Sequence, residues 1–271
     1  MRSAGRVGLV AIGNVSQSFI FRLSSLHARL GPVKGVSFPS ARRLVVSLGA
    51  GSAVAKYSDL ESCSAIWIVA PEARLDEVIR NVAAETPIHK TIFIVCGTPR
   101  ASTSFETLRS QGARLATLSS VDDVWQASFI AEGHSDALLK VREILLKDKR
   151  RCIELDCGAK AKYLAGVNMV TELLRPWASA SVELMSAAGL SRSEASALAE
   201  SLASRSLRAY SKVGMKIWPP GAKRALKEAQ KRAEQLRSQC PREAKLYAEG
   251  LRLALEYFDR GSAKNAAGHA K

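Results

Sequence analysis

The feature that most constrains the fold is the alternation of short apolar runs with helical segments over the first 156 residues. The runs from Val7 to Ala11, Ala65 to Ala70 and Thr91 to Gly97 are almost continuously apolar, which is typical of parallel strands buried on both faces. Four further apolar runs continue this alternation with helical segments: 33–38, 113–119, 129–131 and 152–155. Because helical segments separate these runs, the sequence predicts an α/β fold whose Rossmann-type, mainly parallel sheet is covered on both faces.

The pattern changes after Asp156, where apolar residues recur only at helical spacing. One long helix is expected over residues 160–187, with a kink at Pro176. The sequence Ser191-x-x-Glu194 predicts that the next helix begins with a capping box. The last two helices are expected over residues 222–238 and 241–261. The second half of the chain is therefore predicted to be all-helical.

Composition narrows the class of protein. The chain carries a formal charge of +15, of which residues 140–271 hold +12, from 26 Lys and Arg against 14 Asp and Glu. Such a basic field attracts polyanions, including phosphorylated ligands and nucleic acid. The five cysteines and four histidines lack the spacing of a zinc site, so no metal is expected. No apolar run is long enough for a membrane helix and the first residues do not form a secretory signal, so we expect a cytoplasmic protein.

The turn between the first strand and the helix after it is the candidate nucleotide site. A dinucleotide-binding G-x-G-x-x-G motif would fall on Ala11, Gly13 and Ser16, so only the middle glycine is present. That glycine stands where the backbone approaches a pyrophosphate most closely, and the helix amides that follow can bind phosphate. The expected cofactor contacts are Ala11, Ile12, Gly13, Asn14 and Val15. A turn that kept the fold and lost the ligand is the alternative interpretation.

The choice between NAD and NADP is usually set after the second strand. An acid there binds the ribose 2′-hydroxyl of NAD, whereas an arginine favours the 2′-phosphate of NADP. The segment from Ser37 to Arg43 contains no acid, which favours NADP, and the candidate contacts are Ser37 and Arg42. The expected arginine position holds Phe38, so Arg42 and Arg43 could equally be exposed on the following helix. NAD therefore stays open as the cofactor.

Four segments give the chain a resemblance to a known family. They read RVGLVAIGNV (6–15), IWIVAPEARLDEVI (66–79), FIAEGHSDAL (129–138) and KAKYLAGVNMVTELL (160–174). Over residues 5–260 the chain resembles the oxidoreductases that pair a Rossmann-like domain with the helical domain of unknown function 2520. These are relatives of the 6-phosphogluconate dehydrogenase and pyrroline-5-carboxylate reductase superfamily. The resemblance implies an NAD(P)-dependent oxidoreductase, and it adds Pro71 to the cofactor contacts.

The resemblance also implies where catalysis would take place. In the related hydroxyacid dehydrogenases a lysine and an asparagine on the long helix act in catalysis, which implies Lys162 and Asn168 here, with Lys160 beside them. The alternative is that these are surface lysines and a helix-interior asparagine. The chain departs from the family where histidines are usual: those places read Cys96-Gly97-Thr98, Ser119-Ser120 and Leu164.

The sequence thus predicts three parts: a Rossmann-like NAD(P)-binding domain over 1–156, a helical 6-phosphogluconate dehydrogenase C-terminal-like domain over 157–260, and a disordered tail over 261–271. The leading hypothesis is an oxidoreductase acting on a small carbonyl, imine or hydroxy compound bound between the domains. The partners expected are this small-molecule substrate and a second copy of the chain, paired through the helical domain. Nucleic acid is less favoured because aromatic residues do not interleave with the basic ones. A catalytically inactive binding or scaffolding protein is the competing hypothesis.

Overall fold

The computed structural model describes residues 6–13, 18–121, 128–214 and 222–268. The chain divides into two compact units, residues 1–166 and 167–271, and each is described here by itself. The boundary predicted after residue 156 lies inside the first unit.

The first unit is built on an eight-stranded sheet with the order β3-β2-β1-β4-β5-β6-β7-β8. The strands are β1 (Val7–Ala11), β2 (Leu30–Lys34), β3 (Ser52–Val54), β4 (Ala65–Val69), β5 (Ile92–Cys96), β6 (Arg114–Ser120), β7 (Ser128–Gly133) and β8 (Arg151–Leu155). Every neighbouring pair is parallel except β6 and β7, which are antiparallel. This is the predicted α/β, Rossmann-like fold, and its first six strands have the order of a dinucleotide-binding sheet.

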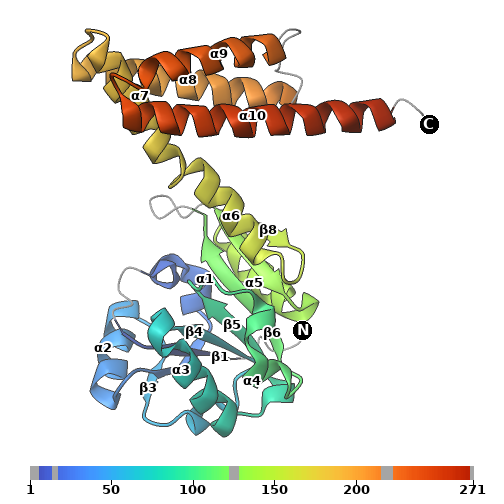
Figure 1. The fold of residues 1–271 in the computed structure, drawn as a ribbon. Coiled ribbons are helices and arrows are strands. Elements are labelled where there is room, and N and C mark those ends of the chain that lie inside the picture. Colours follow the sequence, from blue (N-terminus) through green and yellow to red (C-terminus); the bar gives the residue numbers. More distant parts are fainter. Residues whose placement is uncertain (1–5, 14–17, 122–127, 215–221, 269–271) are drawn as a thin grey trace. The chain divides into compact units, whose positions relative to one another are not determined.

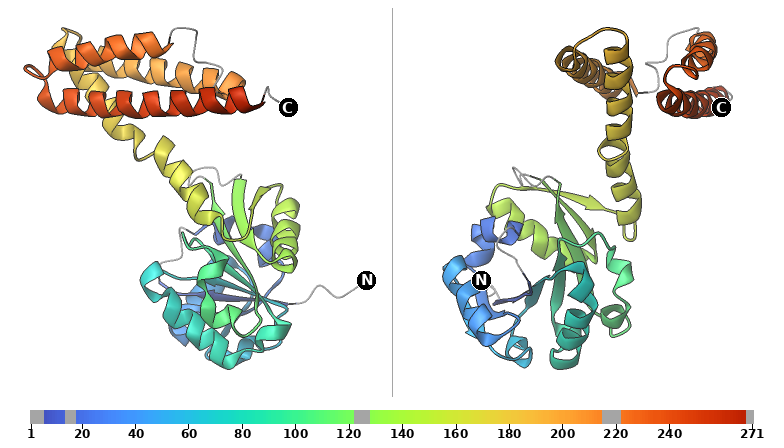
Figure 2. Two further views of the ribbon diagram at one scale, coloured as in Figure 1. Left: turned by 45° about the vertical axis from the view of Figure 1, so that its right-hand side comes forward. Right: turned by 60° about the vertical axis from the view of Figure 1, so that its left-hand side comes forward.

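Helices cover both faces of this sheet (Figures 1 and 2). One face packs against α1 (Ser24–His27), α2 (Phe38–Leu48) and α5 (Ser135–Lys147), and the other against α3 (Glu72–Glu85) and α4 (Glu106–Arg109). Short 3-10 turns complete the unit: Phe19–Arg22, Ser58–Leu60, Ile88–Lys90 and Ser102–Ser104. All five residues of β1, β4 and β5 are buried, which explains why these strands read as continuous apolar runs.

The second strand and the helix after it differ from the prediction. The apolar run 33–38 was expected to be the strand, but β2 ends at Lys34 and Phe38 is already the first residue of α2. The cause is local: Ser37 caps the helix by accepting a hydrogen bond from the amide of Ser40, and Pro39 suits the first helical turn. Strand β3 was not predicted, because its three residues, which follow Gly49 and Gly51, are too few to show an alternating or continuous apolar pattern.

The second unit contains four helices among its described residues, and α6 (Lys160–Val170) leads into it from the first unit. They are α7 (Leu174–Ala187), α8 (Arg192–Val213), α9 (Ala222–Leu236) and α10 (Pro241–Gly268). The single kinked helix predicted over 160–187 is two helices, α6 and α7. Proline at position 176 cannot donate to the carbonyl of Glu172 and its ring collides with that turn, so the break precedes it.

The structure also tests where the later helices were predicted to begin and end. The capping box of Ser191 and Glu194 is confirmed at the start of α8. Helix α10 begins at Pro241 as predicted but continues to Gly268, so the end predicted at Gly261 is wrong and the segment assigned to a disordered tail begins inside a helix. In the described segments, no helix is both long and apolar enough to cross a bilayer.

Candidate functional site

The strands that follow β1 in the chain are added first on one side of it (β2, β3) and then on the other (β4, β5, β6). This switch point places a candidate site at the edge of the sheet formed by the carboxyl ends of β1 and β4. Strand β1 pairs with β2 on one side and with β4 on the other. The amide of Ile12 donates to the carbonyl of Val69 at 2.8 Å, so the carboxyl ends of β1 and β4 stay joined up to this edge. In open α/β sheets, ligands bind outside the carboxyl ends of the strands at such a switch point.

Gly13 lies at this edge in a conformation that favours glycine. Its φ is +85°, and a Cβ built on it would lie 2.8 Å from Cγ of Pro71, the residue that precedes α3. Gly13 and Pro71 are both exposed, whereas Ala11 and Ile12 are buried, so only the backbone of those two residues faces the edge. Asn14 and Val15 lie outside the described residues. Position 13 therefore requires glycine, both for its positive φ and because a Cβ would collide with Pro71.

The residues after β2 differ from those chosen from the sequence. Ser37 uses its side chain to cap α2, and Arg42 is exposed on that helix. The cation at the end of β2 is Lys34, which is 7% exposed, donates to the carbonyl of Gly35 at 2.6 Å, and lies 4.9 Å from the ring centroid of Tyr57. Burial lowers the pKa of Lys34. Sequence reasoning missed Lys34. The signal that could have identified it is that a lysine stands at the end of an apolar strand.

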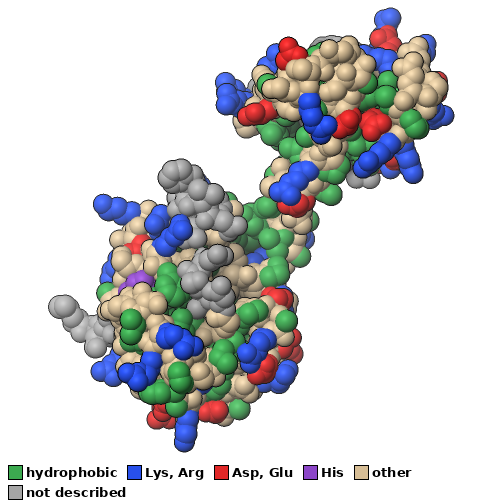
Figure 3. All heavy atoms as spheres, turned by 90° about the vertical axis from the view of Figure 1, so that its left-hand side faces the viewer, with side chains coloured by type: hydrophobic (Ala, Val, Ile, Leu, Met, Phe, Trp, Pro, Cys, Tyr) green, Lys and Arg blue, Asp and Glu red, His purple; other side chains and the backbone are tan. Residues whose placement is uncertain are grey.

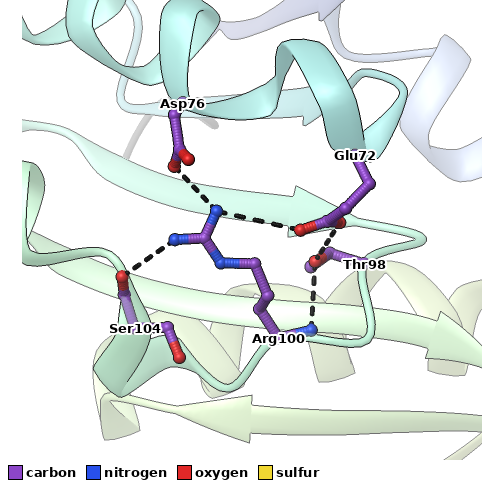
Figure 4. A network of polar contacts seen from close by, with 5 residues as sticks. All are labelled: Glu72, Asp76, Thr98, Arg100 and Ser104. Atoms are coloured by element: carbon purple, nitrogen blue, oxygen red, sulfur yellow. Dashed lines mark hydrogen bonds and ion pairs between the residues drawn. The ribbon is translucent and has the colours of Figure 1, made fainter.

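The loop after β5 is fixed to α3 by the side chain of Arg100 (Figure 4). Arg100 donates to Asp76 at 2.7 Å and to the carbonyl of Ser104 at 3.1 Å, and its guanidinium lies 3.8 Å from Glu72. Thr98, which is buried, donates to Glu72 at 3.0 Å and accepts from the amide of Arg100. The loop that borders the carboxyl end of β5 is therefore held in one conformation by charged and polar contacts.

A buried carboxylate joins three further segments of the first unit. Glu132, at 0% exposure on β7, accepts hydrogen bonds from the amide and hydroxyl of Ser102 at 2.6 and 2.7 Å. It also accepts from the hydroxyl of Thr117 at 3.3 Å and from the amide of Gly158 at 2.7 Å. Burial raises the pKa of Glu132, but the hydrogen bonds together outweigh burial, so its pKa lies below the ordinary value. Glu132 is thus an ionised residue that orders the loop leading into α6.

Lys160, the first residue of α6, is the most enclosed cation of the described chain. It is 1% exposed, and its Nζ donates to Oγ of Ser119 at 3.2 Å, near the carboxyl end of β6. The hydroxyl of Ser119 donates in turn to the carbonyl of Thr98 at 3.3 Å. Burial lowers the pKa of Lys160 to about 8, against the opposing attraction of Glu132 and Glu72. A lysine with this pKa changes charge close to physiological pH.

The structure separates the two predicted catalytic residues from this enclosed cluster. Lys162 is exposed, because two residues along an α-helix turn a side chain by about 200° away from that of Lys160. Asn168 is exposed as well, and it belongs to the second unit while Lys162 belongs to the first. Among the residues with described positions, no group of His, Cys, Asp and Glu could hold a metal ion.

Comparisons with known proteins bear on the fold. No family model matches the sequence, and no curated protein matches it. An imine reductase from Myxococcus stipitatus in complex with NADP+ is 12% identical, with 93% of this chain and 94% of that chain covered and a TM-score of 0.64. A variant of that enzyme in complex with NAD+ is 14% identical, with the same coverage and a TM-score of 0.66.

A third solved structure belongs to a different reductase. The pyrroline-5-carboxylate reductase from Coxiella burnetii is 10% identical, with 92% of this chain and 97% of that chain covered and a TM-score of 0.54. At such identities the likeness establishes the fold. The chain therefore has the same fold as these reductases, a Rossmann-like sheet with a helical C-terminal part.

Proposed function

We propose that this protein is an NAD(P)-dependent oxidoreductase of the cytoplasm. The observation that carries the proposal is Gly13, whose positive φ and lack of a Cβ let the backbone turn closely against Pro71 at the switch point of the sheet. The reductases with the same fold include complexes with NADP+ and NAD+, which supports a nicotinamide dinucleotide as the ligand. The finer relation, to the oxidoreductases with the helical domain of unknown function 2520, is part of the same proposal.

The residues at this edge fit such a cofactor. The backbone of residues 11–13 would face the pyrophosphate, and the edge after β2 offers Lys34, Ser37 and Arg42 with no acid, which favours NADP over NAD. A bound nicotinamide would supply or accept a hydride. The substrate is proposed to be a small carbonyl, imine or hydroxy compound, with Lys162 and Asn168 still the catalytic residues that the resemblance implies.

Thermal unfolding with each cofactor tests the proposal directly. NADPH at millimolar concentration is expected to raise the Tm of the wild-type protein, and NADH to raise it less. Gly13→Ala should abolish the shift, because the new Cβ meets Pro71. Gly112→Ala is the matched control: Gly112 also has a positive φ, of +74°, but a Cβ there meets nothing within 4 Å. If neither NADPH nor NADH shifts the Tm of the wild-type protein, the proposal is wrong.

A catalytically inactive binding protein is the second candidate function. The observation in its favour is that Lys162 and Asn168 are both exposed rather than held by partners. Cofactor binding without turnover across a panel of carbonyl, imine and hydroxy compounds would support it. A reductase activity that Lys162→Ala or Asn168→Ala removes would contradict it.

We also propose a homodimer formed through the helical unit. A groove of about 720 Å³ lies between α7 and α8, and its apolar lining includes Leu174, Trp177, Val182, Met185 and Leu207. A second copy of the chain would cover this apolar surface, as obligate interfaces do. Light scattering coupled to size exclusion should give about twice the chain mass of 29.2 kDa. A monomer at micromolar concentration would contradict the dimer.

A further inference from the structure

The starting point is a buried positive charge that the chain does not neutralise by direct contact. Lys160 is enclosed at 1% exposure, and the hydroxyl of Ser119 is its one hydrogen-bond acceptor among the described residues, at 3.2 Å. None of the ion pairs formed by the described residues includes Lys160. An ammonium group offers three donors, so this one keeps donor capacity to spare.

The groups that face Lys160 come from four elements. On β7, Glu132 attracts the ammonium, but its oxygens already accept four hydrogen bonds from Ser102, Thr117 and Gly158. On α3, Glu72 also attracts it, and on β6 Ser119 is neutral. Burial raises the pKa of the Cys96 thiol on β5, so that group is neutral as well. Lys160 therefore contributes a positive charge at the carboxyl ends of β5 and β6, beside these carboxylates, and loss of that charge would make the local potential more negative.

The position of this charge matters because the two halves of a dinucleotide bind to different halves of a Rossmann sheet. The phosphate-binding turn after β1 and the ribose-binding segment after β2 belong to the adenosine half. The strands on the other side of the switch point, β4, β5 and β6, therefore border the nicotinamide half. The groups linked to Lys160 lie at the ends of β5 and β6, namely Cys96 and Ser119.

We propose that Lys160 shifts the site toward binding the reduced cofactor and away from binding the oxidised one. The proposal rests on the proposed function, because it concerns the same cofactor site. An oxidised nicotinamide ring carries a positive charge and a reduced ring carries none. A buried ammonium on the nicotinamide side repels only the oxidised form, and the repulsion is weakly screened because water is excluded around Lys160.

The preference must depend on pH, with a definite sign. Burial lowers the pKa of Lys160 to about 8, so the side chain is charged at pH 7 and neutral at pH 9.5. The contribution of Lys160 to this preference is therefore present below pH 8 and is lost as the pH rises above it. By linkage, binding of the oxidised cofactor must lower the pKa of Lys160 further and release protons, whereas binding of the reduced cofactor must not.

The experiment compares dissociation constants for NADPH, from its own fluorescence, with those for NADP+, from competition with NADPH. The measured quantity is the ratio of the Kd of NADP+ to the Kd of NADPH at pH 7. Lys160→Met removes the charge and should lower this ratio on the order of tenfold. Lys90→Met is the matched control, because Lys90 is exposed just before β5, at the opposite end of the strand from Cys96, and should leave the ratio unchanged.

The pH dependence of the wild-type protein gives a second readout that needs no variant. The ratio should fall by a similar factor between pH 7 and pH 9.5, and in Lys160→Met it should not change with pH. A ratio that is the same in the wild type and in Lys160→Met, or that does not depend on pH in the wild type, would overturn the proposal while leaving the proposed function intact. Failure of both cofactors to bind the wild type would overturn the proposed function itself.

Discussion

The two units of the chain are alike in having regular secondary structure and opposite in how they bury apolar side chains. In the first unit, six of the eight strands, all but β3 and β8, contain buried residues, and large side chains such as Trp67, Phe93 and Phe129 are almost wholly enclosed. In the second unit, the buried apolar residues with described side chains are Ala195, Ala229, Ala233, Ala244 and Leu251. Four of these five are alanines, whose burial stabilises a fold far less than burial of a large side chain.

The difference shows that helices can be specified without a core of their own. Local signals define the helices of the second unit, as the capping box of α8 illustrates. Its larger apolar residues remain at the surface: Leu173 is 57% exposed, Leu207 50% and Tyr210 52%, and hydrophobic side chains are visible there in Figure 3. Apolar surface of this kind is typical of a unit that is completed by a partner.

The largest expected effect sets a core residue of the first unit against an apolar residue of the second. Phe93→Ala removes a fully buried ring and should lower the free energy of unfolding by about 4 kcal/mol. Leu207→Ala, at a half-exposed position, should lower it by less than about 1 kcal/mol in the monomer. Urea unfolding followed by hydrogen exchange of peptides from each unit measures both. If both substitutions lowered the free energy of unfolding equally, the two units would not differ in how far buried apolar side chains stabilise them.

The next effect concerns the buried carboxylate rather than the apolar core. Glu132→Gln would point an amide NH2 toward the donors of Ser102 and Gly158, leaving buried donors without acceptors. The expected loss is about 3 kcal/mol of unfolding free energy at pH 7. Glu154→Gln, an exchange on the neighbouring strand at a half-exposed ion pair, is the matched control and should change stability little. If Glu132→Gln left the free energy of unfolding unchanged, the hydrogen bonds of Glu132 would add nothing to the stability of the first unit.

A smaller effect, of opposite sign, is expected at Lys160. Its pKa is lowered from 10.5 to about 8 by folding, so at pH 7 the folded state bears the unfavourable burial of a charge. Lys160→Met should therefore stabilise the first unit by about 2 kcal/mol at pH 7, and the difference should shrink as the pH rises from 8 to above 10, because the wild type then folds with a neutral amine. Lys162→Met, at an exposed position, should show no such dependence. Urea unfolding of each protein across this pH range is the measurement.

The smallest effects test whether local signals act alike in both units. Gly49 ends α2 with φ +63° and Gly189 follows α7 with φ +106°, and a Cβ at either position would meet nothing within 4 Å. Alanine at either site should lower stability by about 1 kcal/mol, from backbone strain alone. Thermal unfolding of the two variants gives the values. A large difference between them would show that helix ends, too, depend on the surrounding core.

The sequence predicted the elements that show a clear apolar run or a helical period, and missed or displaced those that show neither. The run Val7–Ala11 is β1, residue for residue, because an apolar run between Arg6 and the turn at Gly13 permits few other interpretations. Strand β2 was displaced because a helix cap at Ser37 interrupts an apolar run that continues to Phe38. The antiparallel direction of β7 could not be predicted either, since the apolar pattern of a buried strand does not encode its direction.

The candidate site was predictable at its glycine and not at its lysine. Gly13 stands two residues after the end of an apolar strand, so its place at the carboxyl end of β1 follows from the sequence. Lys160 and Lys162 are two residues apart in the first turn of the same helix, and nothing in the local pattern says which of them faces inward. That choice depends on Ser119 and Glu132, which come from distant strands. Long-range polar partners of this kind leave no periodic signal in a sequence.

The carboxylate of Glu132 also has a consequence for the order of folding. Its bonds to Thr117, Gly158 and Ser102 span 15, 26 and 30 residues of chain. Closing each of these loops costs entropy before any bond forms, so contacts of such separation form slowly. During synthesis on the ribosome, the bond to Gly158 cannot form until the whole sheet has emerged. The interior of the first unit can therefore assemble early, whereas the enclosure of Lys160 must be among the last events of its folding.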